Sequence, residues 1–207
     1  EIHEINIPGT VEYLGEGAFM GCSSAEMISV ASGNRNYKVD SGALYSADGK
    51  TLLAWPAAGS STYSVKEGTE RIAYGAFANA VFSDVVLPEG LKIIDNYAFY
   101  NCNDLNLPVF PESLEEIGMY AFDLSLGQDA DEHILAEYQI NLGSSFSYLG
   151  KGAFGGYMRK VITVSEDNPH FSSKEGILMN KAGDALIEGR STAVTSLYFR
   201  KEAGIQF

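Results

Sequence analysis

The chain has 207 residues and a formal net charge of −13, from 27 acidic and 14 basic side chains. Its length suits one continuous domain or two small ones. The negative charge argues against binding to nucleic acid or to an anionic membrane surface, because proteins that bind phosphates use basic patches. No stretch approaches the roughly 20 uninterrupted apolar residues that cross a bilayer, so we expect no membrane insertion of this chain.

One sequence motif recurs along the chain. In its first copy, Ile5 to Cys22, an apolar-x-apolar-Pro segment is followed by Val11, Leu14 and the pair Ala18-Phe19. The same frame leads to four further pairs, Ala76-Phe77, Ala98-Phe99, Ala121-Phe122 and Ala153-Phe154. A fixed period of this kind indicates a repeat solenoid, because one repeat cannot bury its apolar face alone and stacked neighbours can.

The frame predicts eight apolar-x-apolar strands. Most are spaced by 22 or 23 residues, and three longer gaps indicate insertions. The strands are expected to start at Ile5, Ile28, Tyr63, Val85, Pro108, Ile140, Ile162 and Leu197. We therefore predict a single solenoid of about eight coils over residues 1–207. Because the chain begins in one repeat and ends inside another, we expect it to be a fragment of a longer protein.

Each coil divides into parts with different roles. The two apolar residues of the strand point inward, because side chains of a strand alternate between its faces. Proline ends the strand, since it cannot donate to a ladder. The next two apolar positions and the Ala-Phe pair are expected to turn the chain back into the core, where the Phe rings fill the interior layer by layer. Cys22 and Cys102 hold equivalent positions in different coils, so we expect both to be buried and too far apart for a disulfide.

Two of the insertions are copies of one module, at about residues 34–56 and 168–190. Asn34 matches Asn168 at an offset of 134 residues, and Gly42 matches Gly176 at the same offset. Each module is predicted to form a β-hairpin that stands off the solenoid. Its turn is expected at Asp48-Gly49 in the first copy, because that dipeptide suits a tight turn, and at Asn180 to Asp184 in the second.

Aromatic residues surround both modules. They are Tyr37, Tyr45 and Trp55 near the first copy and Phe171 in the second. Aromatic side chains on projecting loops suit contacts with a glycan or a protein. The alternative, which we favour, is that they seal each hairpin onto the solenoid, because positions 37 and 171 are aromatic in both copies.

The third insertion, residues 123–137, is acidic. It contains five acidic residues and no basic ones. Oxygen ligands in this segment could suit calcium, but the insertion lacks the Asp-x-Asp-x-Asp-Gly frame of a calcium loop. A solvated acidic loop is the favoured interpretation, and we predict no metal site. The candidate ligands are Asp129, Asp131, Glu132 and His133.

No constellation for catalysis is present in the sequence. His3, His133 and His170 lie in three different regions, and the repeat places no carboxylate or serine beside them in register. No Gly-rich phosphate loop appears, and the glycines lie mostly at coil corners and turns. We therefore predict that the chain is not an enzyme and holds no cofactor.

The outward positions of the strands form a candidate binding surface. Most are polar, but in the middle of the face Val86, Val109 and Leu107 form an apolar group. Its flanking polar residues are Asp84, Gln139 and Asn141. In one interpretation these apolar residues only favour β structure and need no further explanation. In the other, a polar-rimmed apolar patch is an interaction site for a partner.

The motif I-x-I-P-x-x-V-x-x-L-G-x-x-A-F-x-x-C, at Ile5 to Cys22, resembles the BspA-type leucine-rich repeat family of bacterial surface proteins. The resemblance covers nearly the whole chain, although Lys66 and Gly143 replace the strand-ending proline. It implies a curved, right-handed leucine-rich-repeat solenoid with a parallel β-sheet face, exported and displayed on the bacterial cell surface. Several family members are linked to adhesion to host matrix proteins or to other cells.

These observations favour a non-enzymatic, extracellular binding module, most simply one for protein–protein interaction or adhesion to a host matrix or cell-surface protein. A glycan is the alternative partner, and a glycan-binding surface protein would need exposed, coplanar aromatic rings. A third possibility is a structural spacer that holds another domain away from the cell.

Overall fold

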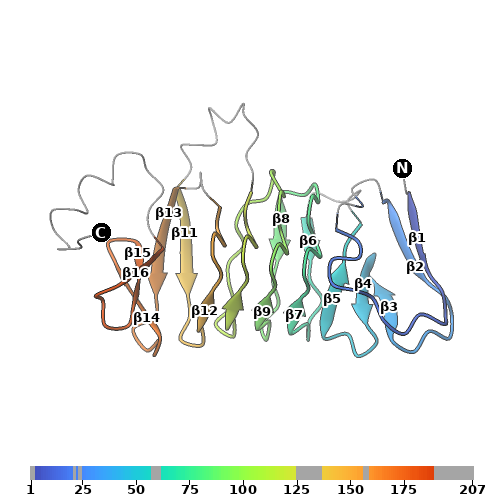
Figure 1. Ribbon diagram of the computed structural model, residues 1–207, viewed down its shortest axis with the longest axis horizontal. Coiled ribbons are helices and arrows are strands. Elements are labelled where there is room, and N and C mark those ends of the chain that lie inside the picture. Colours follow the sequence, from blue (N-terminus) through green and yellow to red (C-terminus); the bar gives the residue numbers. More distant parts are fainter. Residues whose placement is uncertain are drawn as a thin grey trace.

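The computed structural model describes residues 3–20, 22, 25–56, 62–124, 137–155 and 159–188. These residues form a β-solenoid of about six turns, whose coils stack along the long axis of the molecule (Figure 1). The solenoid is the predicted fold, but the predicted count of eight coils was too high. Six of the eight expected strand positions form strands; the position at Pro108 does not, and the one at Leu197 lies outside the described residues.

The predicted strands pair in parallel between neighbouring coils. Their inward residues are buried or half-buried and their outward residues are mostly exposed, because side chains alternate along a strand. The pairs are β1 (Glu4–Ile7) with β2 (Met27–Val30), β6 (Thr62–Ser64) with β8 (Asp84–Val86), and β11 (Glu137–Leu142) with β13 (Arg159–Val164).

The strand expected at Pro108 does not form. The Asn106 N–H donates to the Ser83 carbonyl at 2.8 Å, in register with the other coils. At the matching position of a later coil, the Ile162 N–H donates to the Gly176 carbonyl on the following side. Proline has no N–H, so Pro108 removes the donor toward the following coil. Among the described residues no backbone bond joins residues 107–109 to the preceding coil, although the alternation persists, with Pro108 buried and Val109 exposed.

The structure has a second sheet, which the sequence analysis did not predict. It spans more coils than any of the three parallel strand pairs described above. It has seven strands in the order β12-β10-β9-β7-β5-β4-β3. Four of its strands are only two residues long, which is too short to show an alternating pattern in the sequence. They lie at the apolar positions that were expected only to turn the chain. The strands are β3 (Tyr37–Asp40), β4 (Ala43–Ser46), β5 (Thr51–Ala54), β7 (Arg71–Ile72), β9 (Ile93–Ile94), β10 (Glu116–Ile117) and β12 (Tyr148–Leu149).

Each inserted module is a three-stranded meander rather than a two-stranded hairpin. In the first module β4 pairs antiparallel with both β3 and β5, and β5 continues in parallel with β7. The prediction that this module stands off the solenoid was therefore wrong, because β5 occupies the place of a coil's second strand. The second module repeats the meander with β14 (Phe171–Lys174), β15 (Ile177–Asn180) and β16 (Leu186–Glu188).

The turns of the modules follow the sequence in part. Gly49 has a φ of 78°, as the predicted turn at Asp48-Gly49 requires. The other turn of the first module, at Ser41-Gly42, was not predicted, although both residues have positive φ values of 49° and 80°. The second module has the same turn at Glu175-Gly176, with values of 53° and 79°.

The matched asparagines of the two modules have the same structural role. The Asn168 side-chain amide donates to the carbonyls of Gly143 and Phe146, at 2.9 and 2.7 Å, and its oxygen accepts from the N–H groups of His170 and Phe171. Asn34 makes the equivalent bonds one module earlier, to Pro8, Val11, Asn36 and Tyr37. Each asparagine thus links the start of its module to the preceding coil.

Replacing Asn168 with alanine is expected to lower the free energy of unfolding by about 2–3 kcal/mol. Asn168 is fully buried, so the variant leaves buried carbonyl and amide groups without partners. Asn34→Ala is the matched control and should cost about 1 kcal/mol, because water can reach the groups it leaves free at that half-buried position. Equilibrium denaturation in urea measures both values, and equal costs would contradict the account.

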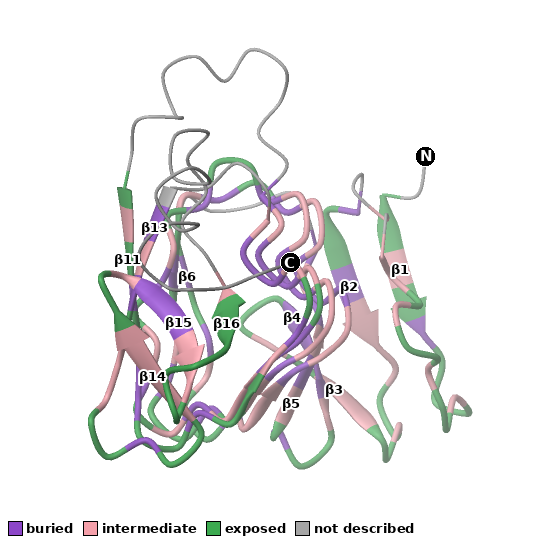
Figure 2. Ribbon diagram, turned by 60° about the vertical axis from the view of Figure 1, so that its left-hand side comes forward, coloured by how far each residue is buried: buried purple, intermediate pink, exposed green. Residues whose placement is uncertain are grey.

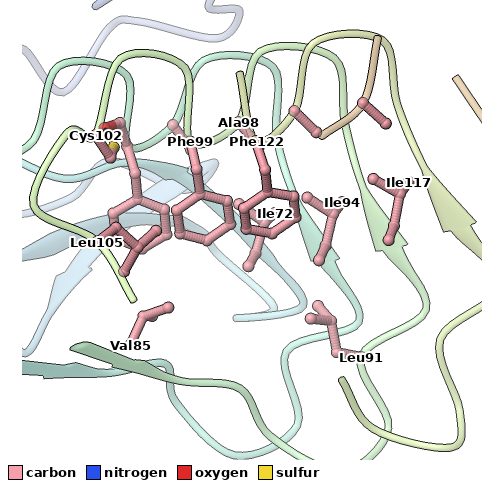
Figure 3. Close-up of a cluster of buried hydrophobic side chains, with 14 of the residues drawn as sticks. Ile72, Val85, Leu91, Ile94, Ala98, Phe99, Cys102, Leu105, Ile117 and Phe122 are labelled. Atoms are coloured by element: carbon pink, nitrogen blue, oxygen red, sulfur yellow. Dashed lines mark hydrogen bonds between the residues drawn. The ribbon is translucent and has the colours of Figure 1, made fainter. Parts of the chain in front are cut away.

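The core is a column of side chains repeated from coil to coil, as predicted for the Phe of each Ala-Phe pair. The Phe77 and Phe99 rings stack at a centroid distance of 4.8 Å, and so do those of Phe99 and Phe122. Figure 3 shows the Phe99 and Phe122 rings parallel to each other, with Ile72, Ile94 and Ile117 in a row beside them. Buried residues recur at matching places of neighbouring coils (Figure 2), so stacking rather than any single coil closes the core.

The two cysteines differ in environment. Both are free; Cys102 is buried and Cys22 only half-buried, so the expectation of burial holds for one of them. The Cys102 thiol donates to the Phe77 carbonyl at 3.0 Å. Burial raises the pKa of this thiol to about 12, so it stays protonated at neutral pH and acts as a small core residue.

Candidate functional site

Two valines form the most exposed apolar group at the outward positions of the central coils. Val86 is 55% exposed and Val109 is 88% exposed. They hold equivalent positions one coil apart, and their neighbours Val85 and Pro108 are buried, so both side chains point away from the core. We call Val86 and Val109 the valine pair.

Leu107 contributes less to this surface than predicted. It is half-buried and packs against the main core, because the segment around Pro108 leaves the ladder. The apolar group is therefore narrower than the sequence indicated and consists of the valine pair. Of the three apolar residues predicted for this site, Val86 and Val109 are thus exposed, and Leu107 is half-buried.

The predicted polar flank is exposed on both sides of the valine pair. Asp84 accepts a hydrogen bond from the Asn106 side chain at 3.2 Å. Asn141 accepts one from the Thr163 hydroxyl, and Gln139 donates to Glu137 at 3.4 Å. These bonds run between or along strands at the surface, so they orient the flanking groups without covering the valines.

The backbone beside Val109 is open. Within the described part of the chain, neither the Leu107 N–H nor the Val109 N–H donates a hydrogen bond to a backbone carbonyl. Exposed valines and free N–H groups therefore lie together in the middle of this face.

The aromatic residues of the first module pack onto the solenoid, as the favoured interpretation held. Tyr45 is fully buried and its hydroxyl lies 3.3 Å from that of Tyr63. Trp55 is half-buried, with its ring centroid 5.5 Å from that of Tyr63 and 5.4 Å from that of Phe82. In the second module Phe171 is half-buried against Phe146, with a centroid distance of 5.8 Å.

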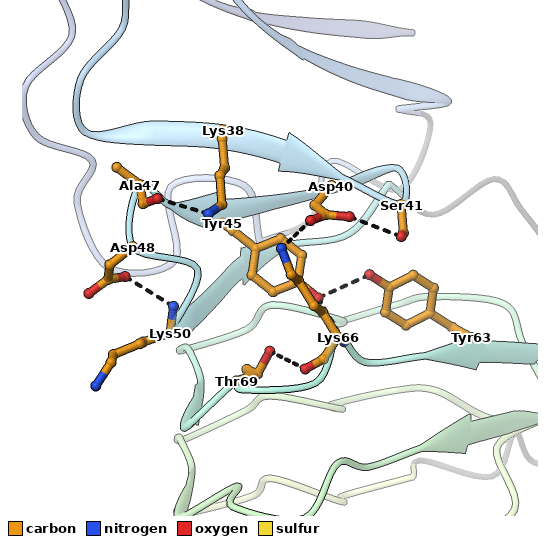
Figure 4. Close-up of polar contacts among 10 residues, drawn as sticks. All are labelled: Lys38, Asp40, Ser41, Tyr45, Ala47, Asp48, Lys50, Tyr63, Lys66 and Thr69. Carbon is orange, nitrogen blue, oxygen red and sulfur yellow. Dashed lines mark hydrogen bonds and ion pairs between the residues drawn. The ribbon is translucent and has the colours of Figure 1, made fainter.

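Lys66 supplies a further link between the first module and the solenoid. It stands where most coils have the strand-ending proline, and unlike proline it has an N–H, which donates to the Tyr45 hydroxyl at 3.3 Å. Its ammonium group pairs with Asp40 of β3 (Figure 4), and this hydrogen bond is the main cause that lowers the pKa of Asp40 below its ordinary value. The sequence analysis took this residue for a tolerated departure, whereas it makes specific contacts.

A stack of tyrosines, in the segments that follow the short strands of the seven-stranded sheet, was not predicted. Tyr97 lies between Tyr74 and Tyr120, with ring centroids 5.4 Å from each. Tyr97 and Tyr120 have left-handed backbones, with φ values of 58° and 53°, a conformation that costs a non-glycine residue about 1–3 kcal/mol. The repeat pattern did not identify these tyrosines, because other coils have a glycine at the same position. These glycines have similar positive φ values: Gly17, Gly75 and Gly152.

The histidines lie apart. His3 is beside Glu26 at 3.3 Å on an exposed edge, His170 is in the second module, and His133 lies outside the described residues. The candidate calcium ligands Asp129, Asp131 and Glu132 also lie outside them. Among the residues that are described, no three His, Cys, Asp or Glu side chains converge as metal ligands would.

Nothing in the described ranges is a helix of the length and apolar character that crossing a bilayer requires.

The comparisons with known proteins support the repeat solenoid fold. The model of the BspA type leucine-rich repeat region matches residues 1–52 and 70–168 in six copies. No curated protein matches the chain.

Two solved structures have a similar fold. The pneumococcal vaccine antigen PcpA superposes with a TM-score of 0.67 at 23% identity, over 80% of this chain and 39% of that one. A leucine-rich cell surface protein from Faecalibacterium prausnitzii A2-165 superposes with a TM-score of 0.63, also at 23% identity, over 74% of this chain and 39% of that one. The present chain therefore spans about two fifths of these proteins' structures. On the match of the repeat model over most of its length, the chain belongs to the BspA-type leucine-rich repeat family.

Proposed function

We propose that this chain is a non-enzymatic binding module of a bacterial surface protein, and that it binds a protein partner through the valine pair. The observation that supports this most is the exposure of Val86 and Val109, 55% and 88%, at adjacent positions beside free backbone N–H groups. Apolar groups placed together at the centre of a polar face are typical of interaction sites.

The charges around the valine pair define the kind of partner. Asp84 is exposed next to Val86, and Glu137 is exposed in β11 beyond Val109, while the whole chain carries a net charge of −13. A partner with an apolar anchor and a basic rim would complement both features. Opposite charges at a rim speed association and suppress wrong partners more than they raise affinity.

Surface display is supported by the family and by the two solved structures, one of which is described as a cell surface protein. A host matrix protein or a protein of another cell is therefore the class of partner we propose, and the function is adhesion. Glycan binding is less favoured. The module aromatics are buried or half-buried, and Tyr97 stacks on Tyr120 and packs at a tilt against Tyr74, so its ring lies between two other rings rather than open to a sugar.

The test is a double substitution of the valine pair. The protein should bind at least one protein in a panel of extracellular matrix proteins and glycans at physiological salt. Val86→Asp with Val109→Asp is expected to weaken that binding at least about tenfold, because it removes the apolar anchors, and to leave the fold unchanged by circular dichroism.

The matched control adds the same charges to the same face. Asn6→Asp with Met27→Asp changes two exposed residues of β1 and β2, away from the valine pair, and should alter the affinity by less than about threefold. A folded valine double variant with full affinity would exclude the valine pair. A glycan hit that survives the substitution would favour the alternative partner, and no binding across the panel would favour the spacer.

A further inference from the structure

We propose that a cavity between the first coil and the second sheet binds a single basic side chain, lysine or arginine, of a polypeptide. The cavity is formed by Tyr13, Glu16, Leu53, Arg71, Tyr74 and Asp95, together with the backbone of residues 14–19. It is separate from the valine pair, and the argument does not depend on the proposed function.

The size of the cavity suits a side chain. Its volume is about 300 Å³, at the lower end of the range for ligand pockets. Residues 14–19 of the first coil line it from one side, and Thr51 of β5 and Arg71 of β7, which pair with each other, line it from the other. Leu53 and Ala73 give the cavity an apolar wall, against which the methylene groups of a long basic side chain can pack.

The charged groups of the cavity leave one negative charge without a partner. Arg71 forms two hydrogen bonds with Asp95, from Nε and Nη2 at 2.7 and 2.8 Å, so its charge is already balanced. Glu16 is exposed and forms no ion pair among the described residues. The cavity therefore has a net charge of −1 and would repel an anion and attract a monovalent cation.

The half-buried position of Asp95 strengthens this argument. Burial raises the pKa of Asp95 above its ordinary value in spite of the Arg71 contact, and the Glu16 carboxylate raises it further. A second carboxylate, that of Glu16, thus acts on the half-buried Asp95 in addition to the Arg71 guanidinium. A second cation entering the cavity would balance the charge of Glu16.

Two tyrosines complete the cavity. Tyr13 is 78% exposed, so its ring is free to cover an entering side chain. Tyr74 is held in place, because its ring packs at a tilt against Tyr97, with a centroid distance of 5.4 Å, and a Cβ at Gly17 would lie only 2.9 Å from its ring. Aromatic rings attract lysine and arginine through their faces. One fixed ring, one open ring and a free carboxylate together suit a basic side chain.

Titration of the protein with N-acetyl-arginine amide, followed by NMR, tests the proposal. The backbone amides of Gly15, Gly17 and Ala73 should shift, with a dissociation constant in the millimolar range that rises with salt. The neutral isostere N-acetyl-citrulline amide should bind at least about fivefold more weakly. Equal binding of the two probes would overturn the role of charge.

The variant Glu16→Gln is expected to weaken binding of the arginine probe at least about fivefold. Glu12→Gln is the matched control, because Glu12 is exposed in the same coil and does not line the cavity; it should leave the affinity unchanged. Both changes are at exposed positions, and unchanged spectra away from the cavity would verify the fold. Equal affinities of the two variants, or stronger shifts with a neutral methyl glycoside, would contradict the proposal.

Discussion

Phe99→Ala is expected to lower the free energy of unfolding by about 3–5 kcal/mol. The Phe99 ring is fully buried and stacks on Phe77 and Phe122, each at 4.8 Å and with an interplanar angle of 9°. Removing the ring leaves a cavity between two coils whose backbones are fixed by hydrogen bonds, such as Phe77 N–H to the Ala98 carbonyl at 2.8 Å. The neighbours therefore cannot collapse to fill it.

Equilibrium denaturation of the two variants Phe99→Ala and Phe19→Ala separates stacking from simple loss of apolar area. Phe19 holds the same position of the first coil but is only half-buried. Its replacement should cost about half as much, since the lost burial is smaller. A cost below about 1 kcal/mol for Phe99→Ala would place this ring outside the core and refute the alignment of the coils.

Gly118→Ala is expected to destabilise the protein by at least about 3 kcal/mol. A Cβ at Gly118 would lie 2.3 Å from the Asn96 nitrogen and 2.6 Å from the Asp95 carbonyl carbon. Both are backbone atoms of the preceding coil, so no side chain can rotate away. The two coils would have to separate, which breaks the 2.7 Å bond from the Gly118 N–H to the Ile94 carbonyl.

Gly15→Ala is the control for this effect. Gly15 follows the second apolar residue of the first coil, as Gly118 does in its own coil, but a Cβ there meets nothing within 4 Å. Its replacement should change the stability by less than about 0.5 kcal/mol. Thermal unfolding of both variants checks the comparison, and a Gly118→Ala protein as stable as Gly15→Ala would show that the coils stack less closely than described.

Much of the fold could be predicted because the repeat aligns residues that share an environment. The Phe column and the alternation around Val85 and Ile140 follow from periodicity alone. The second sheet could not be predicted, since strands such as Ile93–Ile94 are too short to show alternation. The missing strand at Pro108 could not be predicted, since Pro108 lacks only the N–H that faces the following coil and the apolar-x-apolar pattern is otherwise kept.

The candidate site was predictable to a smaller extent. Val86 and Val109 were assigned correctly to the outer face, because their position in the strand determines their direction. Leu107 was placed on that face by the same rule, although its strand is absent. The tyrosine stack and the Glu16 cavity depend on contacts between coils more than 20 residues apart, as in the 24-residue separation of Arg71 and Asp95, and no local pattern marks such contacts.

The most direct test of the proposed binding face is hydrogen exchange of the protein, free and bound to a panel protein that it captures. The Leu107 and Val109 amides have no backbone partner among the described residues, so they should exchange quickly in the free protein. Binding should slow exchange in residues 106–110, while exchange in residues 93–97, which include β9 of the seven-stranded sheet, stays the same. Unchanged exchange at 106–110 in a saturated complex would show that the partner binds elsewhere and would contradict the assignment of the valine pair.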